Sequence, residues 1–288
     1  MNYSKDNFRI MHVPKKYICI FCDFKTHKKY NLDMHKRSKH KDIIHTQIQY
    51  QQPVQMQQQV QGGQDNYVQV QQAPVHQENF DVRLNDNFKL FICGPSRCGK
   101  TFFVSELLEN VKSFAKTPPS SVIYVYSVWQ SKFDEMRKMI NYFIQDDENI
   151  EERIKDRCIG NSSLVVFDDM INSTSLPFIA KLFTVDARHL NMSVVFLTQR
   201  MFVNNEYFRQ ISQNSDFFCV FKNPRNSSEI RVLAQQLTPG DMKLIDIYRE
   251  ATKDPFSYLF INLTQECQER VKYLSHLFNN ESSLRCYV

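Results

Sequence analysis

The segment FKLFICGPSRCGKT at residues 88–101 constrains the fold of this chain more than any other. It consists of a short apolar run, a loop with two glycines, the pair Lys-Thr and a helix-like pattern. The loop fits G-x-x-x-x-G-K-[ST] at every fixed position. Gly94 and Gly99 allow backbone angles and close approaches that a Cβ would block. We therefore expect a strand, a phosphate-binding loop and a helix in this order, which indicates an α/β fold.

The loop residues predict a binding site for a nucleoside triphosphate. Successive N–H groups can surround a phosphate at the N-terminus of the following helix. Lys100 is expected to reach the β- and γ-phosphates, and the Thr101 hydroxyl is expected to hold Mg²⁺. The residues expected to bind ATP are Gly94, Pro95, Ser96, Arg97, Cys98, Gly99, Lys100 and Thr101.

Two apolar segments downstream end in polar side chains suited to phosphate chemistry. Residues 164–169 read LVVFDD, which predicts a buried strand with two acids at its carboxyl end. Residues 193–199 read SVVFLTQ, which predicts another buried strand, and this one ends in the polar pair Thr198-Gln199. In open α/β sheets, ligands bind at the carboxyl ends of the strands. We expect Asp168 to hold Mg²⁺ through water, Asp169 to orient or deprotonate the attacking water, and Gln199 to contact the γ-phosphate or the attacking water.

The N-terminal part, residues 15–42, has the spacing of a small ββα zinc finger. The ligands expected to bind Zn²⁺ are Cys19, Cys22, His35 and His40, in a C-x2-C-x12-H-x4-H pattern. Such a finger contacts either DNA or protein, and the sequence leaves both open. Residues 46–78 are rich in glutamine, contain Pro and Gly, and predict a disordered, flexible linker. The expected ATPase domain spans residues 80–280.

The basic charge is concentrated in the N-terminal arm. Residues 1–46 hold 11 basic and 4 acidic residues, whereas the remainder holds 25 and 27. This arm is therefore the part expected to meet nucleic acid. The eight cysteines show no disulfide framework, which favours a reducing compartment. We find no apolar run long enough for a membrane span and no secretory signal.

Periodicity predicts the remaining elements of the ATPase domain. Further strands are expected at residues 122–126, 217–221 and 256–263, helices at 131–143, 227–237 and 266–278, another helix start at Thr238-Pro-Gly-Asp241, and an exposed charged segment at 146–156. The fold class is α/β, with a mainly parallel central sheet flanked by helices.

These motifs resemble those of the genome-packaging ATPases in the FtsK/HerA translocase superfamily. The similarity is greatest to the branch of poxviruses, adenovirus-like viruses and Polinton/Maverick elements. The matching segments are GPS-x-x-GKT at 94–101, VVFDD at 165–169 and SVVFLTQR at 193–200. The resemblance covers about residues 88–263 and implies a P-loop NTPase of the RecA-like, FtsK/HerA type. Asp169 and the Arg-Cys pair in the loop depart from the commonest pattern, which has Glu and small residues there.

The resemblance also implies a function. It implies an ATP-driven homo-oligomeric ring that moves double-stranded DNA into a capsid, with capsid or portal-like partners and no membrane. Its place would be the host nucleus, a cytoplasmic virus factory or the virion. By position, Gln199 matches the superfamily's polar sensor, and Arg188 matches an arginine that acts in trans on the neighbouring subunit's nucleotide. Arg97, in the loop, could itself contact phosphate, which leaves the identity of that arginine open. Further candidates for it are Arg200, Arg209 and Arg225.

Two other classes of function stay open at this point. A nucleotide-dependent switch should carry Asn-Lys-x-Asp if it uses GTP, and a small kinase should carry an Arg-rich lid; neither is found. A zinc-finger DNA binder with a non-translocating NTPase domain is disfavoured by intact Lys100, Thr101 and Asp168. ATP hydrolysis measured with and without double-stranded DNA separates the three classes.

Overall fold

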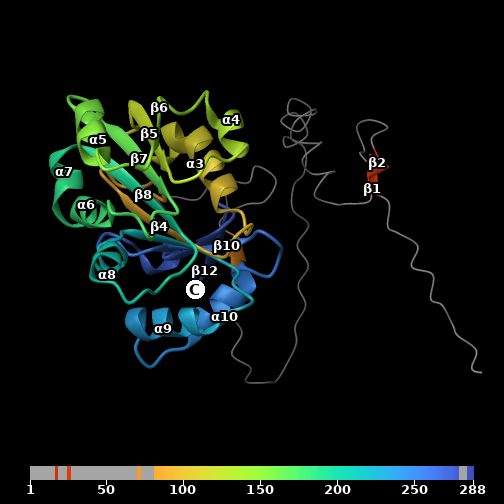
Figure 1. The fold of residues 1–288 in the computed structure, drawn as a ribbon. Coiled ribbons are helices and arrows are strands. Elements are labelled where there is room, and N and C mark those ends of the chain that lie inside the picture. Colours follow the sequence, from red (N-terminus) through yellow and green to blue (C-terminus); the bar gives the residue numbers. More distant parts are fainter. Residues whose placement is uncertain (1–16, 19–24, 27–69, 73–80, 279–283) are drawn as a thin grey trace, which may run out of the picture. The chain divides into compact units, whose positions relative to one another are not determined.

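The chain divides into two units, Met1–Gln64 and Asp65–Val288. The structure is a computed structural model that describes residues 17–18, 25–26, 70–72, 81–278 and 284–288 (Figure 1). In the first unit, β1 (Tyr17–Ile18) pairs antiparallel with β2 (Lys25–Thr26). This pair lies where the expected finger has its hairpin.

The second unit is built on one sheet, of ten strands in the described residues, in the order β3-β12-β11-β10-β9-β4-β8-β7-β5-β6. The strands are β3 (Val70–Gln72), β4 (Lys89–Cys93), β5 (Ser121–Tyr126), β6 (Tyr142–Gln145), β7 (Ser163–Asp168), β8 (Met192–Thr198), β9 (Phe217–Phe221), β10 (Tyr258–Asn262), β11 (Tyr273–Ser275) and β12 (Arg285–Tyr287). From β9 to β6 all neighbours are parallel, whereas β10, β11, β12 and β3 add on antiparallel. The expected mainly parallel α/β architecture is therefore confirmed.

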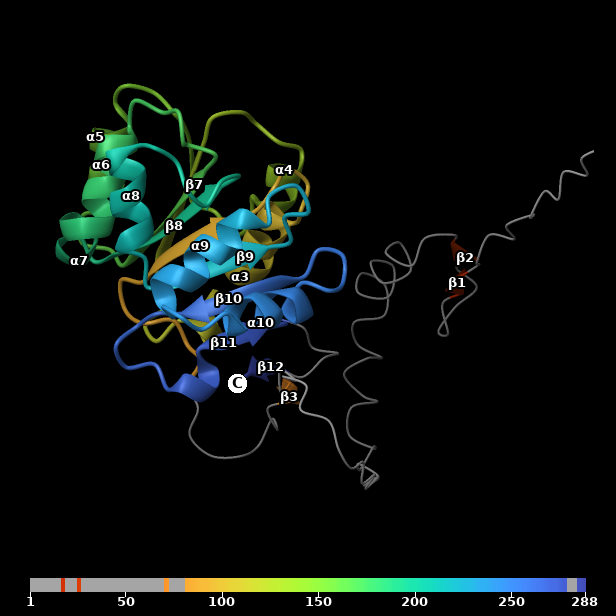
Figure 2. The same cartoon turned by 90° about the horizontal axis from the view of Figure 1, so that it is seen from below.

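Helices cover both faces of this sheet (Figures 1 and 2). They are α3 (Lys100–Phe114), α4 (Lys132–Met136), α5 (Ile150–Cys158), α6 (Leu176–Lys181), the π-helix η1 (Leu182–Asp186), α7 (Ala187–His189), α8 (Glu206–Gln213), α9 (Ser228–Leu237), α10 (Lys243–Ala251) and the 3-10 helix η2 (Glu269–Val271). Helices α3 and α4 pack on one face, and α5, α6 and α8 to α10 pack on the other.

The apolar runs in the sequence form strands because both faces of the sheet are buried. Along β4, Phe91 enters the cluster under α8, while Leu90 and Ile92 enter the cluster under α3. This alternation follows from the two-residue period of a strand. Strands β4, β8 and β7 lie side by side, with Cys93 paired to Thr198 and Asp168 paired to Leu197. Their carboxyl ends therefore meet at one edge of the sheet.

Four expected elements are wrong in type or extent. The helix at 131–143 stops at Met136, because residues 142–145 form β6 and pair with β5. The segment 146–156 is not wholly exposed, because α5 begins at Ile150 and buries one side. The helix at 266–278 is replaced by η2 and β11, which lies between β10 and β12.

The last of the four is the helix start at Thr238. The Thr238 hydroxyl donates to the carbonyl of Ala234, so this residue ends α9, and α10 begins only at Lys243. Two short strands also lie outside the expected 80–280 domain. Strand β3 falls within the predicted linker and pairs with β12, which follows residue 280. Among the described residues, no helix has both the length and the apolar composition needed to cross a bilayer.

Candidate active site

The loop between β4 and α3 requires glycine at both fixed glycine positions of its motif. A Cβ on Gly94 would lie 2.6 Å from the Cβ of Phe221 and 2.7 Å from the Sγ of Cys98. Gly99 has φ 114° and caps the start of α3. That backbone conformation strains any residue with a side chain. The loop therefore turns tightly against β9 and directs the first N–H groups of α3 into the space above it.

Lys100 lies across this loop rather than out in solvent. Its Nζ donates to the carbonyl oxygens of Gly94 and Pro95, at 2.7 and 3.1 Å. Burial raises the pKa of Asp168, and the positive charge of Lys100 opposes that rise, so the two groups are close enough to interact electrostatically. Arg97 is exposed at the tip of the loop and has a positive φ of 64°.

Asp168 ends β7 as a nearly buried carboxylate, 5% exposed. Burial raises its pKa above the ordinary value, and the hydrogen bond from Tyr124 opposes that rise. The Tyr124 hydroxyl donates to Oδ2 at 2.9 Å, and Gln130 Nε2 donates to the same oxygen at 3.4 Å. Both donors hold Oδ2, which leaves Oδ1 as the oxygen available to a cation.

Asp169 and Gln199 connect the acidic strand end to the phosphate loop. The Gln199 amide donates from Nε2 to Oδ2 of Asp169 at 2.9 Å and accepts at Oε1 from the Ser96 hydroxyl at 3.1 Å. Asp169 is exposed, has φ 58°, and its N–H donates to the carbonyl of Leu197. A non-glycine residue in this conformation carries strain that is typical of functional sites. One continuous polar chain therefore runs from the loop, through β8, to β7.

The oxygen atoms at this edge suit a magnesium ion. Mg²⁺ prefers carboxylate, hydroxyl, phosphate and water oxygens. Thr101 supplies a hydroxyl in the first turn of α3, and Asp168 supplies an oriented carboxylate. These residues fit the cation that the loop motif implies. In contrast, Cys19, Cys22, His35 and His40 lie outside the described residues, and zinc binding stays a prediction.

Arg188 does not join this cluster within one chain. It lies in α7, ahead of the amino end of β8, whereas Gln199 follows its carboxyl end. A strand of seven residues separates the two ends by roughly 20 Å. Arg188 is exposed. Its charge interacts electrostatically with Asp216, near the start of β9, rather than with the groups of the phosphate loop. Of the other arginines, Arg200 directly follows Gln199 and is also exposed.

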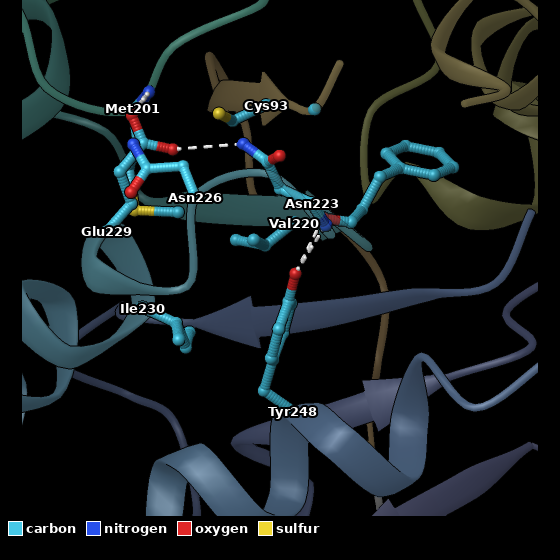
Figure 3. Close-up of a pocket in the computed structure, with 10 residues that line it drawn as sticks. Cys93, Met201, Val220, Asn223, Asn226, Glu229, Ile230 and Tyr248 are labelled. Carbon is cyan, nitrogen blue, oxygen red and sulfur yellow. Dashed lines mark hydrogen bonds between the residues drawn. The ribbon is translucent and has the colours of Figure 1, made fainter. Parts of the chain in front are cut away.

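A small hollow, open to solvent, borders the phosphate loop on its β9 side (Figure 3). Glu229 of α9 accepts from the N–H of Met201, which follows β8, at 3.2 Å. The Tyr248 hydroxyl of α10 accepts from the N–H of Asn223 and donates to the carbonyl of Phe221. The hollow is lined by Cys93, Gly94, Met201, Val220, Phe221, Asn223, Asn226, Glu229, Ile230 and Tyr248. These contacts join the ends of β8 and β9 to α9 and α10.

The sequence did not indicate Tyr124, Gln130 or Glu229 as parts of this region. One signal was available for Tyr124, because a hydroxyl in a buried strand requires a hydrogen-bond partner. No such signal existed for Glu229, whose partner is a backbone N–H. Of the positions predicted for the nucleotide site, the loop residues 94–101, Asp168, Asp169 and Gln199 meet at one edge of the sheet, and Arg188 does not.

The model of the family described as Poxvirus A32 protein matches residues 77–273. The chain belongs to the Poxvirus A32 protein family. This membership confirms the resemblance to the poxvirus branch of viral packaging ATPases that the motifs indicated. No curated protein sequence matches the chain.

The solved structures to which the chain shows similarity include an NTPase and an ATPase. One is the genome packaging NTPase B204 of Sulfolobus turreted icosahedral virus 2 in complex with ATPγS, with 13% identity, 63% of this chain and 95% of that chain covered, and a TM-score of 0.43. Another is the cytoplasmic domain of the type VII secretion ATPase EccC of Thermomonospora curvata, with 16% identity and a TM-score of 0.44. The match covers 69% of this chain and 27% of that chain.

Proposed function

We propose that this member of the Poxvirus A32 family is an ATP-driven motor that moves double-stranded DNA. Its task is to package the genome of a virus or virus-like element into a capsid. The observation that carries the proposal is the polar chain Ser96–Gln199–Asp169 beside Lys100 and Asp168. It links the phosphate loop to the acid expected to act on water. Family membership supports the same conclusion independently.

Each residue of the cluster has a distinct role in this proposal. Lys100 leaves the carbonyl oxygens of its loop and binds the β- and γ-phosphates. Thr101 and, through water, Asp168 would hold Mg²⁺, which would neutralise charge on the phosphate oxygens. Asp169 accepts a hydrogen bond from the attacking water and orients it toward the γ-phosphorus. Gln199 joins Asp169 to the loop, so that the acid is aligned only when the loop is in place.

Arg188 acts in trans in this proposal. Its place ahead of the amino end of β8 keeps it away from the nucleotide of its own chain. In a homo-oligomeric ring, an exposed arginine of this kind can reach the nucleotide of a neighbouring subunit. Arginine fingers contribute about 10³–10⁵ in rate in phosphoryl transfer. Such an arrangement makes hydrolysis depend on assembly.

The N-terminal arm is proposed to tether DNA. Within residues 1–46, basic residues exceed acidic ones by 11 to 4, which favours contact with phosphates. A zinc-bound finger in this arm would read only about 3 bp and would add modest affinity. The capsid or a portal-like protein is the proposed partner at the receiving end.

ATP turnover with and without double-stranded DNA tests the proposal. We expect wild-type protein to hydrolyse ATP, with turnover stimulated by DNA and abolished in Lys100→Ala and Asp169→Asn. Displacement of a triplex-forming strand from the same DNA reports movement along it. Turnover that ignores DNA would favour a switch or kinase, and no turnover would favour a non-translocating DNA binder; either result contradicts the motor.

A further inference from the structure

The arrangement of the site determines on which side of the loop a nucleoside can lie. Asp169 and Gln199 lie at the ends of β7 and β8, on one side of β4. The terminal phosphate belongs on that side in the proposed function. Three phosphates laid along the loop toward the start of α3 therefore direct the nucleoside to the other side of β4. That side is formed by β9 and β10.

Phe256 lies at this place. It precedes β10, whose amino end is at the same edge of the sheet because Tyr258 pairs with Phe221 at the carboxyl end of β9. A Cβ built on Gly99, the residue that caps α3, would lie 3.7 Å from the Cβ of Phe256 and 3.8 Å from its Cδ1. The ring therefore borders the phosphate loop at the start of α3.

Phe256 is unusual both in exposure and in backbone conformation. Its side chain is 58% exposed, although large apolar residues around it are buried. Its φ is 64°, a left-handed conformation that a bulky residue rarely adopts. Such strain persists only where the surrounding structure maintains it, and it is found at ligand clamps.

The backbone on both sides of Phe256 is fixed. The N–H of Ser257 donates to the carbonyl of Asp254 at 3.3 Å, which closes a turn around Phe256. Lys222, which follows β9, donates from Nζ to the carbonyl of Lys253 at 3.5 Å. Tyr258, the first residue of β10, lies two positions after Phe256 and is buried against Phe103 of α3, with ring centroids 4.8 Å apart. The ring is thus presented on a rigid support, which lowers the entropy lost when a ligand binds.

We propose that Phe256 is the platform on which the base of the bound nucleotide stacks. The inference rests on the proposed ATP-binding function and extends it to the nucleoside. Every nucleobase has a π-face, so stacking on an aromatic ring gives affinity with little selection among bases. A purine has the larger face, and purine nucleoside triphosphates are therefore the class of ligand that this surface fits.

Binding of two probes in the presence of Mg²⁺ separates the base from the phosphates. The probes are ATPγS and inorganic tripolyphosphate, titrated by calorimetry into the full-length wild-type protein and its variants. We expect Phe256→Ala to bind ATPγS about tenfold more weakly, since alanine substitution at a stacking ring costs roughly 5- to 150-fold. Affinity for tripolyphosphate should not change.

Two further variants serve as matched controls. Phe256→Tyr keeps an aromatic ring and should retain wild-type affinity for ATPγS. Ile159→Ala removes another strongly exposed apolar side chain, 75% exposed at the end of α5, and should change neither affinity. Alanine keeps the β-carbon, so Phe256→Ala does not relieve the backbone strain and thereby alter the loop.

The possible results are distinct. Unchanged ATPγS affinity in Phe256→Ala, or an equal loss for both probes, would overturn the stacking platform while leaving the proposed function intact. Wild-type protein that does not bind ATPγS at all would overturn the proposed function together with this inference.

Discussion

Replacing Tyr124 by phenylalanine isolates the support of the magnesium-binding carboxylate. Tyr124 has no exposed surface, and its hydroxyl donates to Oδ2 of Asp168 at 2.9 Å. The substitution keeps the ring, which packs against Phe133 at a centroid distance of 4.8 Å. It removes one hydrogen bond and leaves Gln130, at 3.4 Å, as the other donor to that oxygen.

The structure sets the size of the expected effect. Groups that orient a metal-binding carboxylate typically contribute 10- to 100-fold to metal affinity or activity. The hydrogen bond also lowers the pKa of Asp168, against the rise caused by burial, so its loss makes protons compete better with the cation. We expect the free Mg²⁺ concentration for half-maximal ATP hydrolysis to rise by about tenfold in Tyr124→Phe. The acid limb of the pH–rate profile should move to higher pH.

A second buried tyrosine provides the control. Tyr287 has no exposed surface, and its hydroxyl bonds to Ser275 at 2.9 Å on β11 and β12, away from the phosphate loop. Both substitutions remove one buried hydrogen bond and should lower the free energy of unfolding by about 1–3 kcal/mol. Only Tyr124→Phe should alter the Mg²⁺ dependence. An unchanged Mg²⁺ profile, or the same change in Tyr287→Phe, would refute the assigned role.

Three further predictions concern the loop, the polar chain and the arginine. Gly94→Ala should abolish ATPγS binding in calorimetry and destabilise the fold by about 1–3 kcal/mol in denaturant unfolding, because the new Cβ overlaps the neighbouring strand. In the control Gly160→Ala the new Cβ has no atom within 4 Å, and ATPγS binding should be kept. Gln199→Ala should lower kcat by at least about tenfold with ATP affinity changed only a few-fold, because it aligns Asp169 rather than the ground-state nucleotide. Arg188→Ala should bind ATP normally but lose hydrolysis. Adding hydrolysis-deficient Lys100→Ala subunits should restore turnover, because their intact Arg188 acts in trans on the nucleotide of the Arg188→Ala subunits; no restoration would contradict action in trans.

The phosphate-binding half of the site could be predicted from the sequence because its information is local. Eight consecutive residues, from Gly94 to Thr101, contain the turn, the helix start and the charged group. The acids and Gln199 could be placed at strand ends because buried parallel strands read as continuous apolar runs. That they converge follows from β8 lying between β4 and β7.

Contacts between distant segments could not be predicted in this way. The hydroxyl of Tyr124 in the apolar run of β5 indicates only that a partner is needed, and that partner lies 44 positions away. Phe256 reads as the first residue of a strand, and only the folded chain brings it to Gly99. The helix expected at 266–278 failed for the same reason. Tyr273 and Leu274 pack into opposite core clusters because β10 offers an edge for pairing, and tertiary pairing overrides local helical spacing.

A structure of the full-length protein with ATPγS and Mg²⁺ tests the central claim most directly. The account predicts the terminal phosphate within hydrogen-bonding distance of Lys100, with Mg²⁺ on Thr101 and Asp168 and with Asp169 and Gln199 facing the terminal phosphorus. A nucleotide bound elsewhere on the sheet, or a terminal phosphate directed away from the two acids, would contradict it.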